Sequence, residues 1–172
     1  MNKALKSVMT LSLVALILGV LLASVNKLTG SVIADANGDA TVRALREVYP
    51  KGESFSLVNI SEYSGVPTSV REAYRADDGG CVIKLETSGY KSGLVIICGI
   101  SKDGIVTGAK CLESQETLAA EDTYGAGLVG KDESGVMNAQ TVSGATKTTQ
   151  GYKNAIKDAF IMSKILDMGE EN

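Results

Sequence analysis

The sequence predicts an α+β protein in which a single N-terminal transmembrane helix is followed by a small antiparallel sheet with packed helices. Three observations support this fold class. The run of twenty residues between Lys6 and Lys27 carries no charge. Three apolar segments joined by short polar turns lie between residues 81 and 113, as expected for neighbouring strands. Apolar side chains between Tyr152 and Leu166 recur at intervals of three and four, as on one face of a helix.

Length and composition limit the function classes. The chain has 172 residues, of which 22% are charged and 44% are hydrophobic, which suits one small domain plus an accessory segment. A net charge of -3 gives no basic surface for nucleic acid, so a nucleic-acid partner is not expected. The chain contains no His, which removes the commonest metal ligand and the usual general base near neutral pH. Zinc sites and hydrolytic triads are therefore not expected, and we predict no metal site and no catalytic acid or base.

The uncharged N-terminal run predicts a transmembrane anchor at residues 1–27. As a helix that rises about 1.5 Å per residue, twenty residues span roughly 30 Å, which matches a bilayer core. A cleaved signal peptide is the competing interpretation, because Lys3 and Lys6 form a basic start and residues 34–36 offer a small-residue pattern. That pattern lies far beyond the apolar run, and the run is longer than a typical signal core. We therefore expect a retained anchor.

Charges near the predicted anchor indicate its orientation. Lys3, Lys6 and the terminal amine precede it, whereas Lys27 alone follows it directly, although Arg43 and Arg46 also lie on the far side. The positive-inside tendency then places the N-terminus in the cytoplasm. Residues 28–40 are interpreted as a connector, and residues 41–172 as an extracytoplasmic domain of a single-pass cell-membrane protein.

The first element of the predicted domain is a short helix at residues 40–50. Asp39 is a suitable N-terminal cap, and Pro50 is expected to end the helix. Its apolar stripe consists of Val42, Leu45, Val48 and Tyr49. Residues Phe55 to Gly65 are left unassigned, and Ser69 to Tyr74 are interpreted as another helical turn or two.

The spacing of apolar residues changes at Cys81, where apolar and polar residues alternate through Thr87 as in a half-buried strand. Gly89 to Gly93 form a predicted loop, and Leu94 to Ile100 a second strand. Residues 101–104 form a turn into a third strand at residues 105–113. These three strands are expected to pair antiparallel.

The three cysteines, Cys81, Cys98 and Cys111, are widely spaced and form no C-x-x-C pair. This excludes the usual patterns of a zinc ribbon, a thioredoxin-like pair or an iron-sulfur cluster within the chain. Each is interpreted as a small core hydrophobe. One disulfide with a single free thiol is the alternative.

The most informative stretch is TVSGATKTT, Thr141 to Thr149. Ser143 and Gly144 favour a turn, and Gly144 and Ala145 leave little bulk beside the backbone. Hydroxyl side chains follow at the predicted start of the C-terminal helix, on Thr146, Thr148 and Thr149. Unpaired N–H groups and the positive end of the helix dipole favour a phosphate there. Ordinary helix capping is the alternative interpretation.

The order S-G-A-T-x-T, from Ser143 to Thr148, resembles the flavinylation motif of the FMN-binding domain family. This family includes electron-carrying subunits of Rnf-type and sodium-pumping membrane oxidoreductase complexes. The resemblance implies that a flavin transferase uses FAD to esterify the FMN phosphate to the last Thr of the motif, which is Thr148 here. Ser143, Gly144, Ala145 and Thr146 would complete this part of the cofactor site.

The resemblance extends to the segment before the motif. In the family, an E-T pair followed by a Gly-containing loop lies beside the isoalloxazine ring, which implies Glu116, Thr117, Gly127 and Leu128 as ring contacts. The match is interrupted there, because the residues LAAEDTYGA are interposed after Thr117. The acidic residue often found shortly before the motif is also missing, with Asn138 and Gln140 in its neighbourhood.

The resemblance therefore implies a membrane-bound electron-carrying subunit with covalent FMN, in an Rnf-type complex acting between ferredoxin and NAD. Its small size favours the Rnf type over the quinone-reductase type. Ion translocation would belong to the other membrane subunits, and the chain is not expected to catalyse the reaction alone. Two alternatives remain: a free-standing membrane-anchored flavinylated protein of extracellular electron transfer, and a non-catalytic structural subunit whose motif serves only as a helix cap.

Overall fold

A computed structural model describes residues 41–117 and 120–168 of the chain. The anchor predicted at residues 1–27, the connector at 28–40 and the cap at Asp39 lie outside the described residues. Among the helices of the described part, none combines the length and the apolar character that crossing a bilayer requires.

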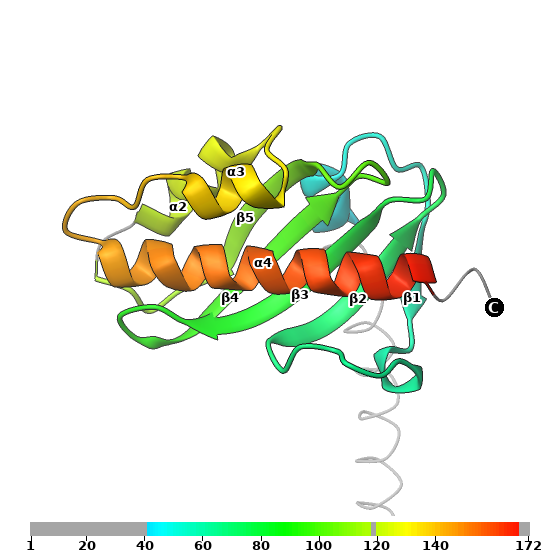
Figure 1. Cartoon of the computed structure of the whole chain (residues 1–172), viewed down its shortest axis with the longest axis horizontal. Coiled ribbons are helices and arrows are strands. Elements are labelled where there is room, and N and C mark those ends of the chain that lie inside the picture. The colour runs from blue at the N-terminus through cyan, green and yellow to red at the C-terminus, as the bar shows by residue number, and fades with distance from the viewer. Residues whose placement is uncertain (1–40, 118–119, 169–172) are drawn as a thin grey trace, which may run out of the picture. The chain divides into compact units, whose positions relative to one another are not determined.

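The sheet is a five-stranded antiparallel meander in chain order (Figure 1). Its strands are β1 (Phe55–Val58), β2 (Val70–Ala76), β3 (Cys81–Ser88), β4 (Ser92–Ile100) and β5 (Val106–Glu113). The three strands predicted from the sequence correspond to β3, β4 and β5, and their antiparallel pairing is confirmed. The α+β class with helices packed on a small antiparallel sheet is likewise confirmed.

The helical turns predicted at Ser69 to Tyr74 are wrong, because this segment forms β2 and pairs with both β1 and β3. A register shift between Val70 and Glu72 interrupts the alternation of side chains along the strand. The shift lets Val70 and Ala73 both enter the main core, while Ala76 is buried in a second core on the other face of the strand. The resulting spacing of three between buried residues resembles that of a helix. The unassigned segment before it contains β1 and the 3₁₀ helix η1 (Ile60–Glu62).

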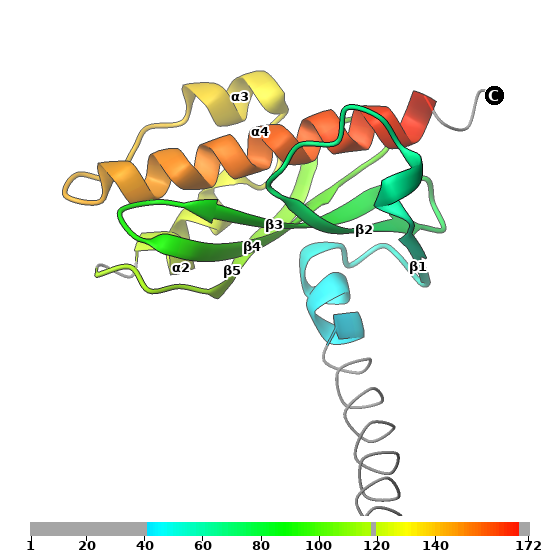
Figure 2. The same cartoon turned by 90° about the horizontal axis from the view of Figure 1, so that it is seen from below.

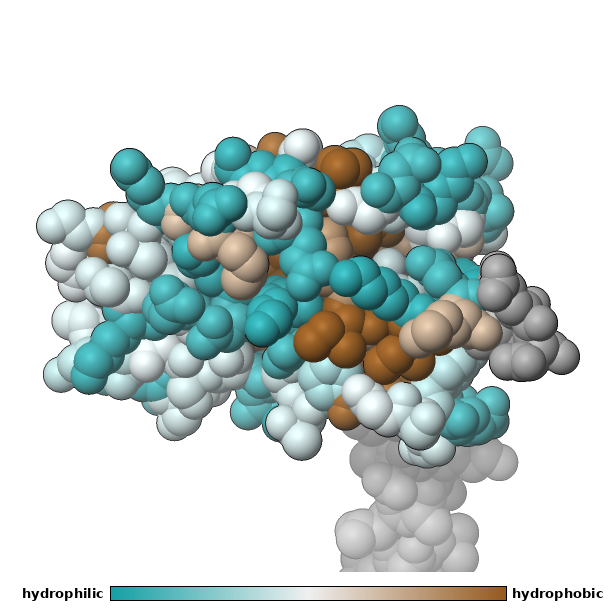
Figure 3. All heavy atoms as spheres, viewed as in Figure 1, coloured by the Kyte–Doolittle hydropathy of each residue, from teal (hydrophilic) through white to brown (hydrophobic). Residues whose placement is uncertain are grey.

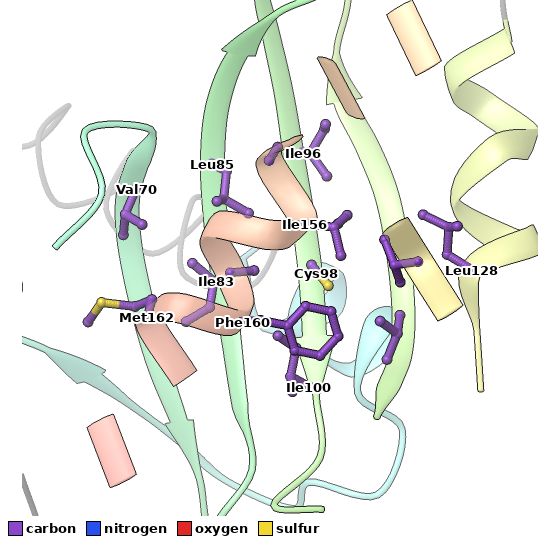
Figure 4. Close-up of a cluster of buried hydrophobic side chains, with 14 of the residues drawn as sticks. Val70, Ile83, Leu85, Ile96, Cys98, Ile100, Leu128, Ile156, Phe160 and Met162 are labelled. Atoms are coloured by element: carbon purple, nitrogen blue, oxygen red, sulfur yellow. The ribbon is translucent and has the colours of Figure 1, made fainter. Parts of the chain in front are cut away.

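The long helix α4 (Thr146–Met168) lies across one face of the sheet (Figures 1 and 2). All members of its predicted apolar face are buried: Tyr152, Ala155, Ile156, Ala159, Phe160, Ser163 and Leu166. Figure 4 shows Ile156, Phe160 and Met162 above strand residues such as Ile83 and Ile96. Burying one such side chain stabilises the fold by about 1.5–3 kcal/mol. The contact between α4 and the sheet forms the larger of the two core clusters, the main core of the domain.

The opposite face of β3 and β4 is also covered. Residues 41–48 are helical, as predicted, and Leu45, Val48 and Tyr49 pack with Val82 and Ile97 in a second, smaller core. Val42 of the predicted stripe is instead 42% exposed. The Thr107 hydroxyl donates to the backbone oxygen of Val48 at 2.7 Å, which holds the end of this helix against β5.

Three short helices connect β5 to α4: α2 (Ala120–Tyr124), the 3₁₀ helix η2 (Gly125–Leu128) and α3 (Glu133–Asn138). Lys153 of α4 is 7% exposed, and its Nζ donates to the backbone oxygens of Met137 at 2.6 Å and Ala139 at 3.0 Å. A buried polar side chain needs hydrogen-bond partners, and Lys153 finds them in these two backbone oxygens. The two bonds thereby hold the end of α3 against α4.

None of the three cysteines forms a disulfide, and Cys81 and Cys98 are buried while Cys111 is partly buried. Burial raises the pKa of the Cys81 thiol to about 11, which leaves it uncharged at neutral pH. The interpretation of these residues as small core hydrophobes is confirmed for Cys81 and Cys98.

The start of α4 meets the turn between β3 and β4 at two glycines. A Cβ on Gly151 would collide with the backbone oxygen of Ser88. A Cβ on Gly89 would lie 2.7 Å from Glu116 Oε1 and 2.8 Å from Thr148 Cα. Backbone therefore packs directly on backbone here, which brings the turn, the residues after β5 and the first turn of α4 together.

Replacing Gly151 by Ala tests this contact. In an exposed helix the change would stabilise by roughly 1 kcal/mol, because Ala has the higher helix propensity. Here we expect the opposite sign, a loss of about 1–3 kcal/mol, since the methyl group must displace the backbone of Ser88. Urea unfolding measures the difference.

Gly127→Ala is the matched control, because a Cβ at Gly127 has no neighbour within 4 Å. Its free energy of unfolding should remain within about 0.5 kcal/mol of that of the unmodified protein. A Gly151→Ala protein as stable as the control variant would contradict the backbone contact.

Candidate functional site

The SGAT sequence forms a tight turn at the entrance to α4, as predicted. The Ala145 N–H donates to the Val142 oxygen at 3.0 Å, and Gly144 has a φ of +83°. A four-residue turn that needs a positive φ at its third position favours glycine there, because a side chain would strain the backbone. Gly144 is thus required by the geometry that directs the chain into the helix.

The start of α4 has no side-chain cap. The Thr149 N–H donates to the Ala145 oxygen at 2.9 Å, so Ala145 stands at the cap position with only a methyl group. The N–H groups of Thr146, Lys147 and Thr148 therefore have no partner within the helix. Such a terminus, at the positive end of a 23-residue helix, favours an anionic group.

The three threonines of the motif have different environments. Thr146 is exposed. Thr148 is 3% exposed, and its hydroxyl donates to Glu116 Oε2 at 2.6 Å. Thr149 is fully buried, and its hydroxyl donates to the oxygens of Ala145 at 3.0 Å and Thr146 at 3.2 Å. Of the three threonine hydroxyls, that of Thr148 is thus the one that donates to an ionisable side chain.

Glu116 is held in place by the turn between β3 and β4. Its carboxylate accepts the N–H of Tyr90 at 3.1 Å and the N–H of Lys91 at 2.9 Å, in addition to the Thr148 hydroxyl. Partial desolvation raises the pKa of Glu116, but these hydrogen bonds and the charge of Lys91 outweigh it and hold the pKa below its ordinary value. The carboxylate is therefore ionised at neutral pH.

A cavity of about 490 Å³ opens at this place, within the range of small-molecule sites. It is lined by Tyr90, Glu116, Thr117, Gly144, Ala145, Thr146, Lys147 and Thr148. On the face seen in Figure 3, residues of intermediate hydropathy cover most of the end where α4 begins (Figures 1 and 3).

The structure brings together six of the predicted site residues and separates three others. Glu116 and Thr117 line the same cavity as residues 144–146 and Thr148, although 26 residues or more separate the two groups in the chain. Ser143 belongs to the preceding turn and is exposed. Gly127 and Leu128 lie in η2 and do not line the cavity, and Leu128 is buried in the main core.

Sequence reasoning missed Tyr90 and Lys147. Tyr90 is 65% exposed at the tip of the turn between β3 and β4, and Lys147 Nζ lies 5.8 Å from its ring centroid. Tyr90 stands in a segment that predicts only a loop, and Lys147 occupies the variable position of the motif. An exposed aromatic residue in a Gly-rich turn was the available signal for Tyr90.

The residues present fit a flavin nucleotide with a phosphate group. The unpaired N–H groups at the start of α4 and the Lys147 side chain can receive the phosphate. The Tyr90 ring offers an aromatic surface on which a planar ring system can stack. This combination of an anion site and an aromatic wall has the chemistry that a phosphorylated aromatic cofactor requires.

Comparison with known proteins agrees with this class. Residues 89–160 match the family model of the FMN-binding domain. The matched region begins at the turn that holds Glu116 and ends within α4, and therefore contains the whole cavity.

The chain is also similar to a curated protein over most of its length. This relative is the G subunit of the Na⁺-translocating ferredoxin:NAD⁺ oxidoreductase complex of Acetobacterium woodii. The two sequences are 28% identical over an alignment that covers 86% of this chain and 79% of the relative. The resemblance to the FMN-binding domain of Rnf-type complexes is thus confirmed.

The hydrogen bond between Thr148 and Glu116 predicts a measurable change in pKa. In Thr148→Val this bond is lost while the side-chain volume is nearly kept, so the pKa of Glu116 should rise. A lowered pKa in the folded state adds stability above the unfolded-state pKa, and that stability is lost as pH falls through the folded-state pKa. The variant should therefore lose less stability on acidification than the unmodified protein.

An NMR titration of the Glu116 side-chain carboxyl carbon measures this pKa directly. Thr146→Val is the control, because Thr146 lines the same cavity but its hydroxyl is exposed. A pKa that stays unchanged in Thr148→Val would show that the hydrogen bond does not form in solution.

Proposed function

We propose that this chain is the electron-carrying subunit of an Rnf-type membrane complex and holds FMN covalently through a phosphoester on Thr148. The observation that carries the proposal is the position of the Thr148 hydroxyl. It lies beside the cavity, at the uncapped start of α4, within the part of the chain that matches the FMN-binding domain.

The environments of the three threonines favour Thr148 as the attachment residue. Thr149 donates its hydroxyl to two backbone oxygens inside the helix, and a substituent on it would have to fit into the core. Thr146 also lines the cavity, but it is exposed, so an ester there would enclose the phosphate less than one on the buried Thr148. A phosphate on Thr148 would instead adjoin the free N–H groups of the helix start.

The roles of the other cavity residues follow from their chemistry. The N–H groups of residues 146–148 and the Lys147 ammonium would bind the phosphate, while Tyr90 and Thr117 would contact the flavin ring. FMN supplies the ability to accept and pass on one or two electrons. The protein then contributes position and electrostatic environment. The chain is not expected to catalyse a reaction by itself.

The covalent link would serve a domain that faces outward from the cell membrane. A dissociating cofactor would be diluted there, whereas an ester keeps it at high effective concentration beside its redox partners. In this proposal residues 1–27 anchor the chain with the N-terminus in the cytoplasm. A flavin transferase attaches FMN, and other membrane subunits couple electron flow between ferredoxin and NAD to ion movement, as the name of the Acetobacterium woodii relative describes for its own complex.

Valine substitutions at the three threonines test the attachment residue. Thr148→Val, co-expressed with a flavin transferase, should carry no covalent flavin, because the attacking oxygen is absent. Thr146→Val should still carry covalent flavin, because its hydroxyl is not the attacking group, and Thr149→Val should remain labelled although it loses two hydrogen bonds. Flavin fluorescence of the denatured protein in a gel reports the label.

Thermal unfolding of each variant supplies the control for folding. Labelling that persists in Thr148→Val and disappears in Thr149→Val would show that the flavin is attached to Thr149 instead. If no variant and no unmodified protein is labelled, the motif serves as a turn and helix start only, as in the structural alternative.

The place of the protein in a membrane complex is tested by gentle detergent extraction and affinity purification from its native membrane. We expect the full-length chain to bring down integral membrane subunits in fixed proportion. Recovery of the flavinylated chain alone under several mild detergents would favour the free-standing carrier of extracellular electron transfer.

A further inference from the structure

We infer that Glu116 is the residue that accepts the proton of the Thr148 hydroxyl when the flavin phosphoester forms. This inference rests on the proposed attachment at Thr148. The flavin-accepting chain would then supply the general base for its own modification, and the transferase would not have to provide one.

The geometry of the pair provides the first argument. The Thr148 oxygen lies 2.6 Å from Glu116 Oε2, which is the length of a strong hydrogen bond from a hydroxyl to an ionised carboxylate. Thr148 is only 3% exposed and its hydroxyl already donates to Glu116, so a base supplied by the transferase would have to compete with this carboxylate for the proton. The proton is thus already directed at its acceptor.

The surroundings of Glu116 provide the second argument. Two backbone N–H groups, from Tyr90 and Lys91, fix the carboxylate, and its Oε1 occupies the space beside Gly89 that a Cβ would fill. Their hydrogen bonds also keep its pKa below the ordinary value, so the carboxylate is in the form that accepts a proton throughout the neutral range. The turn between β3 and β4 therefore holds a base in its working position.

The step balances with a flavin adenine dinucleotide as the donor. The O–H bond of Thr148 breaks and its proton passes to Glu116. The Thr148 oxygen forms a bond to the phosphorus on the riboflavin side, the bond from that phosphorus to the bridging oxygen breaks, and AMP leaves. No atom changes its oxidation state. Glu116 then releases the proton to solvent through the open cavity, and its carboxylate is restored.

A purely structural role of Glu116 is the competing explanation, because its carboxylate also fixes the turn at Tyr90 and Lys91. Glu116→Gln keeps the shape but weakens proton acceptance, whereas Glu116→Asp keeps the charge and withdraws it by about one carbon–carbon bond. Glu116→Ala leaves a space that formate can enter. Glu113→Gln, an exposed carboxylate three residues away in β5, is the matched control.

The experiment measures the rate of covalent labelling of the full-length protein in detergent by a flavin transferase with FAD. We expect kcat to fall by about 100-fold or more in Glu116→Gln, the usual effect of removing a general base, with little change in the KM for the protein. Glu116→Asp should recover part of the rate. Formate should raise the rate of Glu116→Ala in proportion to its concentration, and Glu113→Gln should match the unmodified protein.

Three results would overturn the inference. If the Glu116→Gln protein is labelled as fast as the unmodified protein, or faster, the carboxylate does not act as the base in this step. Formate without effect on Glu116→Ala, together with a lower unfolding temperature of that variant, would assign Glu116 a structural role. An unmodified protein that is not labelled on Thr148 would overturn the proposed attachment, and the inference with it, so the two failures are distinguishable.

Discussion

The contact between the turn after β3 and the first two turns of α4 is the constraint on which the site depends. Gly151 lets the Ser88 backbone touch the helix, and Gly89 leaves room for the Glu116 carboxylate and the Thr148 backbone. The main core fixes α4 over the sheet, and this contact fixes where along the sheet the helix begins. This backbone contact therefore positions the uncapped N–H groups of α4, the Thr148 hydroxyl and the Glu116 carboxylate.

One consequence is that three chemically similar threonines become distinct. Thr149 is used by the helix itself, Thr146 faces solvent, and Thr148 donates to a carboxylate beside the cavity. Selectivity for one hydroxyl thus follows from helix geometry, because successive residues of a helix point in different directions. The same geometry gives an anionic ligand the unpaired N–H groups and the positive end of α4.

Much of this could be predicted from sequence, because local patterns determine it. The alternation from Cys81, the spacing of three and four after Tyr152, and the Gly144 turn each follow from short-range rules. β2 could not be recognised, since its bulge puts Val70 and Ala73 in one core and Ala76 is buried in the other, so that the buried residues are spaced by three. The bond between Glu116 and Thr148 spans 32 residues, and the contribution of Tyr90 depends on how the hairpin folds over α4, so both required the three-dimensional structure. The predicted roles of Gly127 and Leu128 depended on a motif that is interrupted here.

The central claim is that Thr148 carries the flavin, and peptide mass spectrometry on the protein from its native membrane tests it most directly. The account predicts that the peptide containing Thr148 gains the mass of FMN minus water, with fragment ions that place the gain on that residue. An unmodified peptide, or a flavin located on Thr146 or Thr149, would contradict the account.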